Sequence, residues 1–259
     1  MADYGLTDVT EGFRMARNDA ERAIALDPAS AAGYLALAST QISYDWDWDV
    51  ANTCLTKAAA LEPGSAELFR MRSELSAVLG NLHQAIDLYE QAVALDPLRA
   101  DSHLHLGYLL YEAGRHDEAQ AELQRSLELN SHAALVHGLL GKILIAKGEP
   151  NRALAEIDKE PTAWWQLAGL VLAYHSLGRE QDSNAALAEF IAKHDTDSAF
   201  QIAQAYAFRA ESDKSFEWLE RAYKQRDSGL IEIKTDPLFN NLRHDARYVQ
   251  LLKKMRLPP

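Results

Sequence analysis

A six-residue phrase recurs along the chain at almost constant spacing. It reads AIALDP at 23–28, AAALEP at 58–63, AVALDP at 92–97 and SLELNS at 126–131. The leucines shared by the copies follow one another at intervals of 35, 34 and 34 residues, as Leu26, Leu61, Leu95 and Leu129. A fixed period of this length indicates stacked copies of one small unit, because a single copy cannot bury its own apolar face.

The clearest copy, residues 100–131, shows how each unit is expected to fold. Apolar residues at helical spacing predict two helices, and Gly107 and Ala119 are small enough to let them approach closely. Gly114 is expected to end the first helix, because glycine adopts the left-handed backbone conformation at low cost. Asp117 suits the N-cap of the second helix. The unit is therefore a helix–turn–helix.

This unit resembles the tetratricopeptide repeat over about residues 10 to 229. The glycine-to-alanine spacing carries the resemblance together with the period, at Gly80 and Ala85, Gly114 and Ala119, and Gly148 and Ala153. The resemblance implies an all-α, right-handed superhelical solenoid of antiparallel helix pairs. The expected organisation is a partial first repeat at 1–31 with its second helix only, six units at 32–65, 66–99, 100–133, 134–161 (short), 162–195 and 196–229, and a helical cap at 230–259.

The two ends of the chain carry further expectations. Too few residues precede the first predicted helix to supply its partner, so either a divergent N-terminal cap precedes it or the chain is a fragment of a longer protein. We favour the fragment. Residues 227–257 contain Asp236-Pro237-Leu238-Phe239, followed by Leu242-Arg243, Tyr248 and Leu251-Leu252. Through this motif they resemble the segment that follows repeat domains in a group of bacterial signalling proteins. There, such domains lie C-terminal to an adenylate/guanylate cyclase or winged-helix domain. The resemblance implies a regulatory or docking module without cyclase activity of its own.

Composition narrows the partners and the compartment. The chain has 38 acidic and 26 basic residues and a net charge of −12, which argues against nucleic-acid binding because that needs lysine and arginine to neutralise phosphates. Its single cysteine, Cys54, excludes an internal disulfide framework. The N-terminus lacks a signal-peptide pattern and no apolar run reaches membrane-spanning length. A cytoplasmic protein that binds neither membrane nor nucleic acid is expected.

No pattern in the sequence indicates catalysis, a cofactor or a metal. Phosphate-binding loops, nucleophile elbows and zinc-ligand spacings are missing from the sequence. His103 and His105 point to different faces of their helix, while His103 and His137 occupy equivalent core positions in successive units. We therefore expect that the chain is not an enzyme.

The partner is instead expected to be a protein or peptide. In the resembled family, a concave groove is lined mainly by the first helices of the units. The matching positions here are Arg70, Glu74, His105, Tyr108, Tyr111, Lys142, His175, Phe200, Gln201, Gln204 and Phe208. Cationic donors are few in this set, so an acidic peptide terminus is not expected to bind. The alternatives are packing against an upstream domain of the same protein, self-association as a homodimer, and, less favoured, an enzyme on a helical scaffold.

The segment SYDWDWD at 43–49 departs from the repeat. In the repeat register Trp46 takes the position of the turn glycine, Trp48 an aromatic position between the helices, and Asp49 the N-cap. A left-handed tryptophan would be strained, so the first helix is expected to end differently here. An exposed Trp46 would be a candidate anchor for a partner, because aromatic residues are enriched at interface hot spots.

Overall fold

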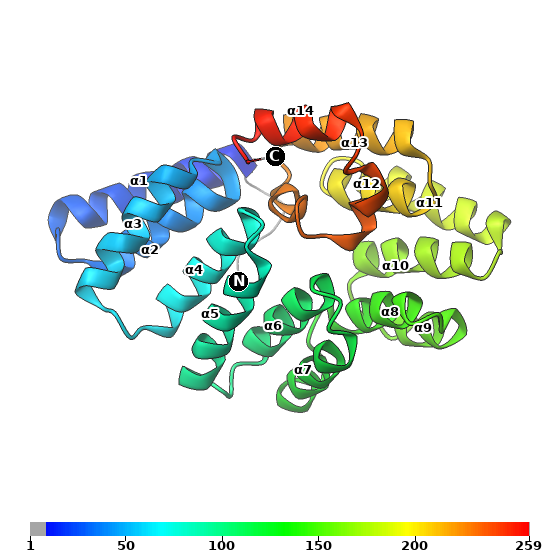
Figure 1. Ribbon diagram of the computed structural model, residues 1–259, viewed down its shortest axis with the longest axis horizontal. Coiled ribbons are helices and arrows are strands. Elements are labelled where there is room, and N and C mark those ends of the chain that lie inside the picture. Colours follow the sequence, from blue (N-terminus) through cyan, green and yellow to red (C-terminus); the bar gives the residue numbers. More distant parts are fainter. Residues whose placement is uncertain (1–8, 259) are drawn as a thin grey trace. The chain divides into compact units, whose positions relative to one another are not determined.

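The computed structural model describes residues 9–258. These residues form helices joined by short turns, with no strand among them (Figure 1). The all-α repeat fold predicted from the sequence is confirmed. The chain divides into two compact units, unit 1 (Met1–Leu95) and unit 2 (Asp96–Pro259), which are described separately. Within 9–258, no helix combines the length and apolar character needed to cross a membrane.

Unit 1 consists of a leading helix and two helix pairs. Its elements are α1 (Val9–Leu26), α2 (Ala31–Thr40), the π-helical turn η1 (Gln41–Asp45), α3 (Trp48–Leu61), α4 (Ala66–Val78) and α5 (Leu82–Leu95). Helix α1 packs against α2, as α2 does against α3 and α4 against α5. Ser30 and Ser65 cap α2 and α4, each accepting a backbone N–H through its hydroxyl at 3.1 Å.

The turn between α2 and α3 corrects two expectations. Helix α2 does end irregularly, through η1, but Trp46 adopts the left-handed conformation at φ 56° and is only 2% exposed. The exposed-anchor hypothesis is therefore wrong. Burial of a whole indole offsets the roughly 1–2 kcal/mol that the backbone conformation costs. The N-cap of α3 is Asp47, which accepts from the N–H of Val50 at 3.1 Å, and Asp49 lies inside the helix.

The same turn is fastened to α1. The rings of Phe13 and Tyr44 stack at a centroid distance of 4.8 Å. Asp45 forms an ion pair with Arg17 and accepts a hydrogen bond from Nε2 of Gln41 at 2.9 Å. The alternating aromatic and acidic residues of this segment are thus used to pack three helices of unit 1 together.

Unit 2 begins with four helix pairs. They are α6 (Ala100–Glu112) with α7 (His116–Leu129), α8 (Val136–Ala146) with α9 (Pro150–Ile157), α10 (Ala163–Ser176) with α11 (Glu180–His194), and α12 (Ala199–Phe208) with α13 (Ser212–Gln225). Gly114 ends α6 at φ 72°, as expected. The predicted N-cap at Asp117 is wrong, because the Arg115 N–H bonds to the Leu110 carbonyl at 2.9 Å and the chain enters α7 earlier.

A histidine–glutamate pair recurs in successive units of unit 2. Nδ1 of His103 on α6 lies 2.7 Å from Oε2 of Glu122 on α7, and Nδ1 of His137 on α8 lies 2.6 Å from Oε1 of Glu156 on α9. Both histidines are engaged in helix packing, as their equivalent repeat positions indicated. The pair links the two helices of each unit through their polar edges.

A buried carboxylate closes the short unit at 134–161. Glu160 is 4% exposed and accepts backbone N–H groups from Leu135, Gly138 and Thr162, each at 3.0 Å. Leu135, which precedes α8, has a left-handed backbone at φ 69°. The Glu160 carboxylate accepts N–H groups at the start of α8 that have no partner within the helix. The break in the repeat at DKEP therefore has a structural cause.

The last part of unit 2 turns back across the repeats. It contains two short 3₁₀ helices, η2 (Ser228–Glu232) and η3 (Pro237–Leu242), followed by α14 (Ala246–Lys254), which packs against α13. We call residues 227–245 the return segment. In Figure 1 it lies, in orange, on the side of α6 and α8 that faces away from α7 and α9. Leu230, Ile233 and Phe239 within it are fully buried.

Candidate functional site

The return segment is hydrogen-bonded to α6 at two places. The hydroxyl of Tyr108 donates to Oε2 of Glu232 at 2.6 Å, across 124 positions of sequence. The hydroxyl of Thr235 donates to Oε1 of Glu112 at 2.6 Å. These bonds join the last part of unit 2 to its first helix.

Helix α12 holds the other side of the return segment. Nε2 of Gln204 donates to Asp236, and Nδ2 of Asn241 donates to the carbonyl of Ala207 at 2.8 Å. The rings of Phe200 and Phe239 lie 5.2 Å apart. The return segment is therefore an integral part of the unit 2 core.

Phe200 also explains a glycine in η2. A Cβ added to Gly229 would lie 2.6 Å from the Phe200 ring, so only glycine permits this approach. The N–H of Phe200 donates to Oδ2 of Asp227 at 2.9 Å. The start of the return segment is fixed on the N-terminus of α12 by both contacts.

Lys142 on α8 lies in the middle of this arrangement and is 3% exposed. Its Nζ stands 4.0 Å from the centroid of the Trp165 ring and 3.5 Å from Oε1 of Gln204. Among the described residues it forms no ion pair with a carboxylate. Its positive charge is therefore stabilised mainly by the aromatic face and by the field of nearby acids.

Three carboxyl groups surround this lysine, and burial perturbs all of them. Burial raises the pKa of Glu232 to about 7, and it raises the pKa of Glu112 well above its ordinary value. The pKa of Asp236 is also raised, mainly by burial. Burial lowers the pKa of Lys142, although the three acids oppose the change. Burial thus favours the uncharged form of each of these four groups.

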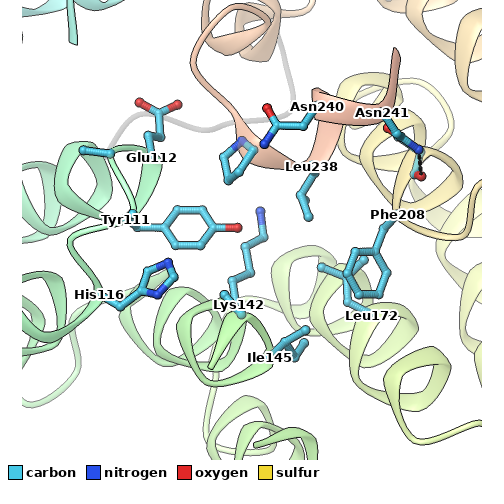
Figure 2. A pocket seen from close by; sticks show the side chains of 15 residues that line it. Tyr111, Glu112, His116, Lys142, Ile145, Leu172, Phe208, Leu238, Asn240 and Asn241 are labelled. Atoms are coloured by element: carbon cyan, nitrogen blue, oxygen red, sulfur yellow. Dashed lines mark hydrogen bonds between the residues drawn. The ribbon is translucent and has the colours of Figure 1, made fainter. Parts of the chain in front are cut away.

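A cavity of about 620 Å³ remains between η3 and the C-terminal ends of α6, α8 and α12. Apolar side chains form most of its wall, from Ile145, Leu172, Phe208 and Leu238. Figure 2 shows the hydroxyl of Tyr111 and the ammonium of Lys142 pointing into the same space. We call this cavity the strap pocket. Its size and mixed lining are typical of ligand sites.

The comparisons with known proteins agree with this architecture. Models of the tetratricopeptide repeat family match residues 47–100, 79–143 and 110–161. These matches cover less than half of the chain, and over residues 47–161 the chain is similar to the tetratricopeptide repeat. The pairing of helices continues on both sides of this stretch.

Curated relatives match part of the chain. Tetratricopeptide repeat protein 7B from Homo sapiens is 33% identical over 103 residues, which are 40% of this chain and 12% of that protein. The BBSome complex member BBS4 from Bos taurus is 27% identical over 188 residues, 71% of this chain and 35% of that protein. The matches therefore span only a minor part of the length of these relatives.

Solved structures show the same fold. The type IV pilus biogenesis factor PilW superposes with a TM-score of 0.62 and 20% identity, covering 74% of this chain and 90% of that one. A tetratricopeptide repeat protein from Parabacteroides merdae gives 0.63 and 17% identity, covering 96% and 94%. At these identities the likeness concerns the fold alone.

The structure divides the eleven predicted groove residues among several environments. The strap pocket brings Tyr111, Lys142 and Phe208 together, and the ring of His175 lies 5.7 Å from that of Phe208. His105 is exposed. The others lie against the return segment or in unit 1: Tyr108, Phe200, Gln201 and Gln204 in the first group, Arg70 and Glu74 in the second.

The return segment covers part of the surface that the first helices of unit 2 were expected to offer. The hydroxyl of Tyr108 is used within the chain, and Phe200 and Gln204 are buried. In unit 1, Arg70 forms an ion pair with Glu67, and burial raises the pKa of Glu74 to about 7. Whether any of the eleven residues binds a partner stays a prediction.

Several residues of the site were missed by sequence reasoning. Glu112, Glu232 and Thr235 carry the polar contacts of the return segment, and Leu238 and Asn241 line the strap pocket. The motif that begins at Asp236 was noticed, but it was interpreted as part of a terminal cap. Among residues 9–258, no group of three or more His, Cys, Asp or Glu side chains is placed to hold a metal ion.

Proposed function

We propose that this chain is a protein-interaction module, the regulatory or docking part of a larger bacterial signalling protein. Its tetratricopeptide repeats support the general role, since repeat proteins use their inner surfaces to bind other proteins. The similarity of its C-terminal residues to signalling proteins supports the context. A cytoplasmic location belongs to the same proposal and agrees with a single, free cysteine, Cys54.

We propose the strap pocket as the place where the partner binds. The return segment fills much of the inner surface of unit 2, while Tyr111, Lys142 and Phe208 line the remaining cavity of about 620 Å³. We propose that a segment of a partner protein inserts here, in place of the long groove expected from the sequence. The partner is another protein or an upstream domain of the same protein.

Selection of peptides from a random phage-displayed library tests this function. Peptides selected on the intact chain are measured by calorimetry against Leu238→Arg, which places a long charged side chain at the pocket wall. The matched control is Leu98→Arg, because Leu98 is 71% exposed and lies outside the pocket. We expect binding to fall at least about tenfold in the first variant and to persist in the second.

Two results would contradict the proposal. One is failure to select any peptide that binds the folded chain saturably. The other is equal binding to Leu238→Arg and Leu98→Arg, with circular dichroism showing both folded. Light scattering on the same preparation measures self-association, and a dimer whose stability depends on Leu238 would replace the foreign partner with a second copy of this chain.

A further inference from the structure

We infer that the strap pocket recognises a bulky apolar side chain together with a neutral main-chain carbonyl of the same peptide, the carbonyl accepting hydrogen bonds from Tyr111 and Lys142. This inference rests on the proposed function and names the chemistry of its partner. It makes the pocket selective for an internal stretch of a partner over an acidic chain terminus.

Tyr111 provides the first observation. Its side chain is 3% exposed, and Figure 2 shows its hydroxyl directed into the pocket. Its contacts within the described part of the chain are between rings, with Tyr108 and His116 at centroid distances of 6.2 Å each, and its hydroxyl has no hydrogen-bond partner there. A hydroxyl that faces the open space of a pocket can donate to a ligand that enters it.

Lys142 provides a second donor in the same space. An ammonium has three N–H groups, and here one of them reaches Gln204 Oε1 at the long distance of 3.5 Å. The Trp165 ring stabilises the positive charge of Lys142 through a cation–π contact. This contact leaves the other N–H groups able to donate hydrogen bonds. Tyr111 and Lys142 therefore present two convergent donors to one acceptor atom of a ligand.

The surrounding charge decides which acceptor fits. Glu112 lines the pocket itself, and Glu232 and Asp236 both lie close enough to act on Lys142. A ligand carboxylate would bring a further negative charge into this buried cluster, where burial already disfavours charged carboxyl groups, in a chain whose net charge is −12. A carbonyl oxygen accepts the same hydrogen bonds without adding a negative charge.

The apolar part of the pocket wall determines which side chain of the ligand binds beside its carbonyl. Ile145, Leu172, Phe208 and Leu238 leave an apolar space beside the two donors. Burying an apolar side chain in such a space is favourable in proportion to its area, which selects leucine, methionine or phenylalanine over small or charged residues. The cavity of about 620 Å³ has room for this side chain and its neighbouring main chain.

Nuclear magnetic resonance titration with five-residue peptides tests the inference. The probes are acetyl-Ala-Ala-X-Ala-Ala-amides with X as Leu, Phe, Ala or Asp, and a Leu peptide that ends in a free carboxylate directly after X. We expect saturable shifts at the pocket for Leu and Phe at millimolar concentration. The Ala and Asp peptides and the free carboxylate are expected to bind at least about fivefold more weakly.

Variants separate the hydrogen bonds from the apolar contact. Tyr111→Phe keeps the ring and removes the hydroxyl, and should weaken the Leu peptide about fivefold, the loss expected for one hydrogen bond. Tyr174→Phe, outside the pocket, is the control and should bind as the parent does. Lys142→Met is a second variant, and a hydrogen–deuterium exchange profile like the parent's shows that its core is retained.

The outcomes distinguish the inference from the proposed function. Equal affinity in Tyr111→Phe and the parent, or tighter binding of the free carboxylate than of the amide, would overturn the inference and leave a protein-binding pocket. Absence of saturable shifts with every peptide would overturn both. Shifts that map to unit 1 instead would assign the binding surface elsewhere and also overturn both.

Discussion

Unit 1 and unit 2 each contain a segment that departs from the repeat pattern, and the contacts of the two segments span very different distances along the sequence. In unit 1 the turn at η1 buries Trp46 between helices that are neighbours in sequence. In unit 2 the return segment buries Phe239 and reaches α6 across 124 positions. Both end in a fully buried aromatic ring. The local departure packs three neighbouring helices together, whereas the distant one makes several helix pairs depend on a single segment.

Ending the chain after Gly229 should have the largest effect. The loss removes Leu230, Ile233 and Phe239 from the core of unit 2, at about 1.5–3 kcal/mol each. Their sum approaches the whole stability of a typical domain, about 5–15 kcal/mol. We expect aggregation or loss of the cooperative thermal transition of unit 2, measured by calorimetry. A truncated chain with an unchanged transition would show that the return segment is dispensable.

Trp46→Ala should rank second and act within unit 1. Removing a fully buried indole is expected to cost about 3–5 kcal/mol, measured by urea denaturation. Trp48, which is 8% exposed, should cost less on the same change. This order reverses the one expected from the sequence, where Trp48 was the buried ring. Trp46→Gly, which relieves the left-handed backbone, should differ from Trp46→Ala by about 1 kcal/mol or less.

Buried acids should make the free energy of unfolding depend on pH in both units. Glu232 has a pKa of about 7 in the folded chain against 4.5 for the ordinary group, so the folded state binds more protons between these values. The free energy of unfolding therefore falls as pH rises from about 5 to about 8, by on the order of 1–3 kcal/mol. Glu112 and Asp236 act in the same direction, whereas the lowered pKa of Lys142 acts in the opposite direction, because its folded state binds fewer protons than its unfolded state.

Urea titrations at the two pH values measure this difference. Glu232→Gln should flatten the dependence, because an amide can still accept the Tyr108 hydroxyl but does not titrate. Glu74→Gln removes the corresponding group of unit 1, whose pKa is also raised to about 7. We expect the two substitutions to flatten the dependence by similar amounts, and no flattening with either one would contradict the assignment.

Gly114→Ala should give the smallest effect. Gly114 has a φ of 72° and no neighbouring atom within 4 Å of an added Cβ, so the cost is backbone strain alone, about 1 kcal/mol. Gly12 is the opposite control, since it lies inside α1 with equal space around it. Gly12→Ala should stabilise by about 0.5–1 kcal/mol in thermal denaturation. If Gly114→Ala and Gly12→Ala both lowered the thermal stability, steric contacts of the added Cβ would matter more than the backbone angle φ.

The sequence predicted the helix pairs because their signals are local and periodic. The turn glycines, the small residues and the repeated leucines each report on neighbours within about one unit. The burial of Trp46 was missed because the prediction weighed backbone strain without the burial that offsets it. The return segment has no period, and a contact such as Tyr108 with Glu232 leaves no pattern in either local sequence.

The long connection between Tyr108 and Glu232 also sets an order in time. A ribosome adds about 5–20 residues per second, so the 124 positions between them take on the order of ten seconds to synthesise. During that interval α6 has emerged and its inner surface lacks the segment that later covers it. The nascent chain thus passes through an uncovered stage that the finished protein no longer shows, and molecular chaperones would meet it there.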